Sequence, residues 1–291
     1  MTDQILFSKT VLITGATAGI GKATAAALAQ KNWHVILHGR SEQRCQAVIA
    51  ELRQTNPQAK LDYLVADFAS LQSVRNMATQ IKQQFPHLDV LVNNAGSFFM
   101  SRQVSQDGNE LTLAVNHLAP FLLTTQLLEL LKGSPSARIV NVSSGAHAGV
   151  RLNFDDIQLE RRFAGFQAYG GSKLMNIYFT YELHRRLQAE GLAGKKVSVN
   201  ALHPGFVATE FAKNNGGFFR VVMGLMQKLR IGNPKSPEKG AETSIFLASS
   251  SAVEGVSGKY FDNCVEIRSS KESYDQNAAA RLWEWSEKAV K

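Results

Sequence analysis

The sequence predicts an α/β protein with a single doubly wound parallel sheet and helices on both faces. Short, almost wholly apolar runs alternate with stretches of helical periodicity along the chain. Strands that are apolar on both sides are typical of a parallel sheet covered by helices. No linker rich in proline or serine interrupts the pattern, so we expect residues 1–291 to form one domain.

The expected elements alternate along the chain. A short apolar run indicates a buried strand, and a longer amphipathic stretch indicates a helix. Strands are expected at residues 10–15, 34–39, 61–67, 88–96, 137–144 and 196–205, and helices at 22–31, 41–54, 70–85, 109–132 and 166–187. A further amphipathic helix is expected at 211–233, with Phe218, Phe219, Val222, Leu225 and Met226 on its apolar side.

Composition excludes several classes of protein. The chain is long enough to bury a sizeable core, and its 44% hydrophobic and 19% charged residues are typical of globular proteins. Its start has no signal-peptide pattern, and no run of 18 or more apolar residues occurs. We therefore expect a cytoplasmic protein without a transmembrane segment. The net charge of +8 is spread over separate basic pairs. Solvated helix faces explain such pairs at least as well as a nucleic-acid or anionic surface does.

Neither a disulfide framework nor a metal site is expected. The two cysteines, Cys45 and Cys264, are far apart in the sequence. His34 and His38 face the same side of an expected strand, but no third ligand accompanies them.

A glycine-rich loop, TGATAGIG, joins the first strand to the first helix. Gly15 permits a tight turn, Gly19 lets backbone N–H groups approach a pyrophosphate, and Gly21 lets the helix pack closely on the sheet. Thr17 and Ile20 lie in the same loop and are expected to contact the cofactor. The strand before the loop and the helix after it predict a Rossmann-type dinucleotide site.

The residues after the second and third strands indicate which cofactor binds. Arg40 and Ser41 stand where a cofactor with a free ribose 2′-hydroxyl would need an acidic side chain. An arginine can pair with a 2′-phosphate, with the serine as a second donor, which favours NADP(H) over NAD. The alternative is an ordinary exposed arginine. Asp67 can accept from an adenine amino group or cap the helix that begins near Ser70. The next residue, Phe68, is also expected to contact the cofactor.

Tyr169 and Lys173 are four residues apart on an expected helix, so they face the same way. An unperturbed phenol has a pKa of about 10, and a nearby ammonium is expected to lower it. Such a tyrosine can give a proton to a carbonyl oxygen or take one from an alcohol. Tyr178 and Tyr181 on the same helix have no lysine at this spacing. Because a cation follows a tyrosine by four residues often by chance, the pair alone does not identify an active site.

Together with the glycine loop, several motifs resemble those of the short-chain dehydrogenase/reductase family. They are TGATAGIG at 14–21, NNAG at 93–96, Asn116 in VNHLAPF, NVSS at 141–144, YGGSK at 169–173 and HPGFVAT at 203–209. They occur in the family's order and span nearly the whole chain. The stretches VNHLAPFLLTTQLL, RIVNVSSGAH and SKLMNIYFTYEL resemble the retinol dehydrogenase branch in particular.

The resemblance implies a role for each site residue. Tyr169 would be the general acid/base, Lys173 would lower its pKa and hold the ribose, and Ser144 would bind the substrate oxygen. Asn116 would hold a water that relays protons to Lys173, whereas Ser143 would be structural. The implied cofactor contacts are Asn94, Ala95 and Gly96 near the ribose, with Tyr169 and Lys173, and Pro204, Gly205, Val207 and Thr209 near the nicotinamide.

The resemblance also implies two structural features, a homo-oligomer and an extra loop. Many family members form homo-oligomers through the helices that carry Asn116 and Tyr169, so a homo-oligomer is expected. Ser144 and Tyr169 are 25 residues apart, which is more than in many members. An extra loop is therefore expected beside the active site.

These observations predict an NADP(H)-dependent oxidoreductase that moves a hydride between the nicotinamide and a carbonyl carbon or its alcohol. The apolar side of 211–233, together with Phe98, Phe99 and Met100, indicates a bulky apolar aldehyde or ketone, retinal-like or another lipid carbonyl. The alternative for these apolar stripes is core packing.

Other functions are considered beside this one. A carbonyl reductase of the same family could act on a xenobiotic ketone or a protochlorophyllide-like substrate. A catalytically silent NADP-binding regulator would have a damaged Asn–Ser–Tyr–Lys set, and here all four residues are present. Lys228 and Arg230 beside an apolar face would permit weak contact with an anionic membrane surface.

Overall fold

The computed structural model describes residues 9–207 and 235–291. Its strands are β1 (Thr10–Ile13), β2 (His34–Gly39), β3 (Leu61–Val65), β4 (Val90–Asn93), β5 (Ala137–Val142), β6 (Val197–Leu202), β7 (Tyr260–Asp262) and β8 (Val265–Ile267). They form one sheet in the order β3-β2-β1-β4-β5-β6-β7-β8, and all neighbours are parallel except β7 and β8. This confirms the doubly wound sheet. The strand order reverses between β1 and β4, and such sheets bind ligands in the crevice at that point.

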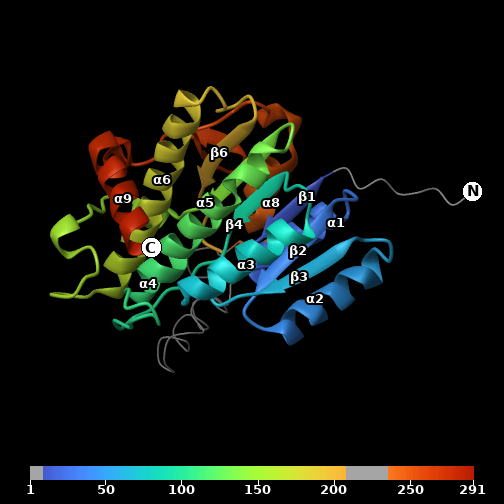
Figure 1. The fold of residues 1–291 in the computed structure, drawn as a ribbon, viewed down its shortest axis with the longest axis horizontal. Helices are drawn as coiled ribbons and strands as arrows, with labels where there is room; N and C mark the ends of the chain where they lie inside the picture. The colour runs from blue at the N-terminus through green and yellow to red at the C-terminus, as the bar shows by residue number, and fades with distance from the viewer. Residues whose placement is uncertain (1–8, 208–234) are drawn as a thin grey trace, which may run out of the picture.

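Helices cover both faces of the sheet (Figure 1). They are α1 (Gly19–Ala29), α2 (Glu42–Thr55), α3 (Leu71–Gln84), α4 (Leu111–Leu113), α5 (Ala119–Lys132), α6 (Gly165–Ala189), α8 (Pro237–Ser249) and α9 (Gln276–Ala289). The helices α1, α2 and α8 pack on one face, and α3, α5 and α6 pack on the other, with α9 beside α6. Short 3-10 turns lie at Gly145–His147, Phe154–Asp156, Ser251–Val253 and Lys271–Tyr274.

Strand side chains alternate between two hydrophobic cores. Leu12 of β1 joins the core under α3, α5 and α6, whereas Val11 and Ile13 join the core under α1 and α8. In β5, Ile139 and Val140 divide in the same way. Because both faces are buried, the strands appear in the sequence as nearly continuous apolar runs.

Apart from shifted ends of several strands and helices, the structure differs from the expected elements in two respects. The helix expected at 109–132 is interrupted, because Ala114–Leu118 forms a π turn between α4 and α5. The elements α8, β7, β8 and α9 are not among the predicted ones; β7 and β8 have three residues each, too few to show a periodicity. The helix expected at 211–233 lies outside the described residues.

In the part of the chain that the structure describes, one helical segment, Leu111–Lys132, is long and apolar enough to cross a membrane by length and composition. In this fold it comprises α4, the π turn and α5, and 72% of its most apolar window is buried inside the protein. The core helix of a globular domain meets the same criteria, and the packing of α5 against α3 is that of a core helix.

Candidate active site

The glycine loop shapes the amino end of α1. Gly15 and Gly19 have φ values of +66° and +53°, which favour glycine. A Cβ on Gly21 would lie 2.3 Å from the Gly15 carbonyl oxygen, so the close contact between loop and helix needs glycine there. No side chain caps the helix at Ala18, and its first turn has no acidic residue. The uncapped N–H groups and the positive end of α1 therefore fit an anionic pyrophosphate.

Asn94 and Thr14 hold this loop against β4. The Asn94 amide donates to the main-chain carbonyls of Thr14 at 2.8 Å and Gly15 at 3.2 Å. In return, the Thr14 hydroxyl accepts from the backbone N–H groups of Asn94 and Ala95, each at 2.9 Å. Asn94, expected near the ribose, thus supports the loop directly. Thr14 is a supporting residue that the sequence analysis missed.

His38 connects the glycine loop to β2 and to the end of β3. Its Nδ1 accepts from the Gly15 N–H at 3.3 Å, and its Nε2 donates to the Ala66 carbonyl at 3.1 Å. The ring stacks on Phe68 with 4.4 Å between centroids. Burial lowers the pKa of His38 to about 4, so the ring is neutral at pH 7, as an accepting nitrogen requires. Phe68 therefore supports this histidine.

The residues expected to bind a 2′-phosphate lie at the carboxyl end of β2. Arg40 is exposed. Ser41 caps α2 by accepting from the Arg44 N–H at 3.4 Å, which leaves its hydroxyl able to donate. Gly39 packs against the glycine loop, since a Cβ there would lie 2.5 Å from Thr17 Cγ2. Arg40, Ser41 and Thr17 therefore border one edge of the crevice.

Asp67 lies beyond the end of β3 and is exposed. Its Oδ1 accepts from the Ala69 N–H at 3.0 Å. The cap of α3 is Ser70, whose hydroxyl accepts from the Ser73 N–H. The interpretation of Asp67 as a helix cap is therefore wrong, and its contact with adenine stays a prediction.

The loop after β6 packs against α8 and the start of α1. A Cβ on Gly240 of α8 would lie 2.6 Å from Val207 Cγ2 and 3.3 Å from Ile20 Cγ1. Gly205 has a φ of +79°, which gives the loop its turn. Of the residues expected at the nicotinamide, Pro204, Gly205 and Val207 lie in this loop; Thr209 lies outside the described residues, as does the substrate-covering segment 211–233.

Ser144, Tyr169 and Lys173 meet where β5 ends and α6 begins. The Ser144 hydroxyl is hydrogen-bonded to Tyr169. Lys173 Nζ lies 5.6 Å from the centroid of the Tyr169 ring and donates to the Val142 carbonyl at 3.1 Å. Ser143 is turned away from this group, because its buried hydroxyl donates to the Lys173 carbonyl at 2.8 Å, as expected of a structural serine.

The π turn between α4 and α5 brings Asn116 to the same place. Its buried Oδ1 accepts from the Ser97 N–H at 2.7 Å, and its Nδ2 donates to the Ser97 carbonyl and to the Ser172 hydroxyl, both at 2.9 Å. Gly96 lies between Asn116 and Lys173: a Cβ on Gly96 would be 3.4 Å from Oδ1 and 3.3 Å from Nζ. Ser172 is a partner of Asn116 that the sequence analysis missed, and the role of Asn116 in holding a water stays a prediction.

The pKa of Tyr169 is shifted in the direction opposite to the expected one. Burial raises it to about 12, and the hydrogen bond from Ser144 opposes this shift. Burial also lowers the pKa of Lys173 to about 8. The ammonium is directed to the Val142 carbonyl rather than to the phenol oxygen, so in the protein alone desolvation outweighs its attraction for a phenolate.

Two neighbouring glycines in α6 offer a matched pair of variants. A Cβ on Gly170 would lie 2.6 Å from the Ala146 carbonyl oxygen, whereas one on Gly171 would meet only Leu152 Cδ2, at 3.6 Å. We expect Gly170→Ala to push the turn that carries Ser144 away from α6, lowering both Tm and turnover. Gly171→Ala should keep turnover and stabilise the helix by about 0.5–1 kcal/mol. Equal Tm values in thermal unfolding would contradict this difference in packing.

An aromatic wall borders Tyr169. The ring of Phe98 stands edge-on to Tyr169 with 5.7 Å between centroids and is tilted against Phe166 at 5.0 Å. Phe98 and Phe99 are buried, whereas Phe166 is 69% and Met100 45% exposed. Beside the phenol, the protein therefore presents an apolar edge formed by Phe98 and Phe166.

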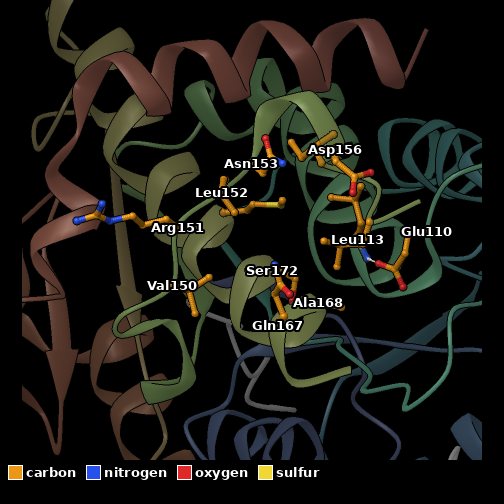
Figure 2. A pocket seen from close by; sticks show the side chains of 14 residues that line it. Glu110, Leu113, Val150, Arg151, Leu152, Asn153, Asp156, Gln167, Ala168 and Ser172 are labelled. Carbon is orange, nitrogen blue, oxygen red and sulfur yellow. Dashed lines mark hydrogen bonds between the residues drawn. The ribbon is translucent and has the colours of Figure 1, made fainter. Parts of the chain in front are cut away.

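The extra segment between Ser144 and Tyr169 packs on a flank of α6 (Figure 2). Its residues 150–159 face Ala168, Gly171, Ser172 and Met175 across a cavity of about 30 Å³. That volume accommodates one water molecule and no organic substrate. The expected loop thus lies against the helix that carries Tyr169, on the flank of Ser172.

The two histidines of β2 take separate partners. His34 Nε2 lies 2.6 Å from an Asp62 carboxylate oxygen, and His38 has the contacts described above. Within residues 9–207 and 235–291, no three His, Cys, Asp or Glu side chains gather as metal ligands would.

Comparison with known proteins places the chain in a family. The profile of the short chain dehydrogenase family matches residues 9–217. Human retinol dehydrogenase 14 is 41% identical over 98% of this chain and 87% of the human protein, and human polyprenol dehydrogenase is 37% identical over 94% and 83%. A solved structure from Beutenbergia cavernae, assigned as an NAD(P)-dependent gluconate 5-dehydrogenase with NADP bound at low occupancy, has a TM-score of 0.68 and 28% identity, covering 89% of this chain and 96% of that one.

The matched region contains the glycine loop, the end of β5 and the start of α6, where the structure brings Ser144, Tyr169 and Lys173 together. The chain therefore belongs to the short-chain dehydrogenase family of oxidoreductases and is similar to retinol dehydrogenases over nearly its whole length.

Proposed function

We propose that this oxidoreductase reduces a bulky apolar aldehyde or ketone with NADPH and, in reverse, oxidises the corresponding alcohol. The observation that carries this proposal is the hydrogen bond between Ser144 and Tyr169, set beside the apolar edge of Phe98 and Phe166. Polar groups that converge next to an apolar wall suit a ligand with one oxygen and a large hydrocarbon body.

Ser144 and Tyr169 act on the substrate oxygen. A carbonyl oxygen bound between them accepts from both hydroxyls, which polarises the carbonyl bond. A nicotinamide cofactor held at the glycine loop would supply the hydride that reduces the carbonyl carbon, and would receive it when the alcohol is oxidised. Tyr169 gives its proton to the oxygen as negative charge develops there, and the nearby Lys173 stabilises the phenolate that is left.

The raised pKa of Tyr169 favours reduction at neutral pH. A phenol with a pKa of about 12 keeps its proton at pH 7, which is the form that a carbonyl needs and an alcohol does not. Oxidation needs the phenolate, whose fraction grows as pH rises toward the pKa. We therefore expect kcat/KM for alcohol oxidation to rise between pH 7 and pH 9 while that for carbonyl reduction does not. A flat profile for oxidation would contradict Tyr169 as the base.

The choice of NADP(H) is supported by Arg40 and Ser41 at the end of β2. An exposed guanidinium and a hydroxyl able to donate suit a 2′-phosphate. The relative from Beutenbergia cavernae was solved with NADP.

A bulky apolar substrate is supported by the aromatic wall and by the relatives named for retinol and for polyprenol, which are long apolar alcohols. We expect Phe166→Ala to lower kcat/KM about tenfold for a bulky carbonyl, through lost apolar contact, and to leave a short aldehyde unaffected. The control is Val265→Ala, which trims an exposed apolar residue of β8. Equal losses with both aldehydes would contradict a substrate-contacting role for Phe166.

The proposal is tested by NADPH consumption, with NADH in parallel, against all-trans-retinal, a long-chain enal, a bulky aromatic ketone and a short aldehyde. Turnover of retinal or the enal with NADPH supports the proposed substrate class. Turnover of the aromatic ketone alone favours a xenobiotic carbonyl reductase, and a pigment assay under light tests a protochlorophyllide-like substrate. Tight NADPH binding without any turnover favours a silent regulator.

We further propose a cytoplasmic homo-oligomer. Both cysteines are free, which suits a reducing compartment.

Oligomerisation is supported by the family resemblance, yet Trp283 of α9 packs on Phe121 of α5 and Phe179 of α6. The helix α9 therefore covers part of α5 and α6, and copies that meet there would contact α9. Analytical ultracentrifugation measures the oligomeric state, and a monomer would contradict the proposed homo-oligomer. Recovery of the protein in the membrane fraction would contradict a cytoplasmic location.

A further inference from the structure

His147 holds Ser144 through its main chain. Ser144 begins the turn that contains His147, and its hydroxyl accepts from the Ala146 N–H at 3.2 Å. The buried His147 ring places Nδ1 2.6 Å from the Ser144 carbonyl oxygen, which also accepts from the His147 N–H at 3.2 Å. The turn therefore fixes both the hydroxyl and the carbonyl of Ser144.

The second ring nitrogen determines the tautomer of His147. Nε2 lies 3.1 Å from the backbone nitrogen of Ser270. Because a backbone N–H only donates, Nε2 accepts, and Nδ1 must carry the proton that is donated to Ser144. Burial lowers the pKa of His147, with the nearby His203 acting in the same direction, so the ring is neutral at pH 7. Tyr260 packs edge-on against it at 5.2 Å and limits its rotation.

Ser270 belongs to a segment that α6 anchors independently. The Tyr181 hydroxyl is hydrogen-bonded to the Ser269 hydroxyl at 2.7 Å, and the Tyr178 hydroxyl donates to the Glu272 carbonyl at 2.8 Å. These are the two tyrosines of α6 without a lysine four residues on. The segment around Ser270 is therefore attached to the same helix that carries Tyr169.

We infer that His147 is a positioning residue for Ser144, since it ties the Ser144 carbonyl to a segment anchored on α6. Ser144 follows β5 and Tyr169 lies on α6, yet both hydroxyls must meet one substrate oxygen. Their separation has to be kept within a fraction of an ångström for efficient chemistry. His147 therefore links the main chain of Ser144 to a segment that is bound to α6. The inference rests on the proposed function, because it takes Ser144 to bind the substrate oxygen.

Three variants of the full chain separate positioning from general packing. His147→Phe keeps an aromatic ring and removes both nitrogens, His147→Asn keeps a donor close to the place of Nδ1, and Tyr181→Phe loosens the same segment without touching Ser144. We expect His147→Phe to lower kcat for carbonyl reduction about 10- to 100-fold with unchanged NADPH affinity. His147→Asn should recover most of kcat, and Tyr181→Phe should lose less of it than His147→Phe does, because the Tyr178 hydroxyl still holds the segment.

Unchanged kcat in His147→Phe would overturn the inference, as would a loss in His147→Asn as large as in His147→Phe. A second readout does not depend on turnover. NMR of the histidine ring nitrogens should show His147 protonated at Nδ1 at pH 7, and protonation at Nε2 would overturn the inference by itself. Failure of the wild type to reduce any carbonyl, with the Nδ1 tautomer observed, would refute the proposed function while leaving the link from His147 to Ser144 supported.

Discussion

Tyr169→Phe is expected to lower turnover by about 100- to 10,000-fold while NADPH still binds, because it removes the proton that the substrate oxygen receives. The phenyl ring keeps its edge-on packing against Phe98, so the cleft should keep its shape. Steady-state reduction of the best carbonyl gives the loss in kcat, and NADPH fluorescence titration gives the cofactor affinity. Near-normal turnover of this variant would contradict the acid/base role.

The same helix supplies the controls for that experiment. Tyr178→Phe and Tyr181→Phe each remove a buried hydroxyl that bonds to the segment around Ser270. Each should cost about 1 kcal/mol of stability and lower kcat far less than Tyr169→Phe does. If all three variants lost turnover equally, the loss in Tyr169→Phe would reflect disturbance of α6 rather than missing proton transfer.

Arg40→Asp is expected to reverse the coenzyme preference from NADPH toward NADH. A charge-assisted hydrogen bond to a phosphate contributes about 1.5–3 kcal/mol, and the new carboxylate would repel the 2′-phosphate while accepting from a free 2′-hydroxyl. We expect the ratio of kcat/KM for NADPH to that for NADH to fall by at least about 10-fold. Parallel assays with both coenzymes measure this ratio.

The control for Arg40→Asp is Lys31→Asp. It changes the net charge of the chain by the same amount. Lys31 precedes β2 and so lies where the strands begin, whereas the glycine loop lies where β1 ends. It should leave the coenzyme ratio unchanged. An unchanged ratio in Arg40→Asp would rule out Arg40 as the residue that reads the 2′-phosphate, and equal shifts in both variants would indicate an effect of overall charge.

The elements that carry the candidate site could be predicted because their signals are local. The strand expected at 34–39 is β2 with the same bounds, and the helix expected at 166–187 differs from α6 by one residue at its start and two at its end. The π turn at Asn116 could not be predicted in this way. It accompanies hydrogen bonds from Asn116 to Ser97 and Ser172, which are far away in sequence and leave no periodic signal.

The supporting residues of the site were missed for the same reason. Thr14, His38 and Ser172 act through partners on other strands and helices. In the sequence they are an ordinary threonine, histidine and serine. The pairing of His147 with Ser270 joins residues 123 positions apart and likewise has no counterpart in any short motif.

The sequence by itself determined the doubly wound sheet, the glycine loop and the candidate set Asn116, Ser144, Tyr169 and Lys173. These features depend on residues that are close together in the chain. They are apolar periodicity, backbone angles that only glycine readily adopts and helical spacing, and they are visible in the short motifs of the family. Only the tertiary structure decided that the pKa of Tyr169 is raised rather than lowered and that His147 donates to Ser144. Burial and hydrogen-bond partners decide both, and they arise when segments distant in the chain pack together.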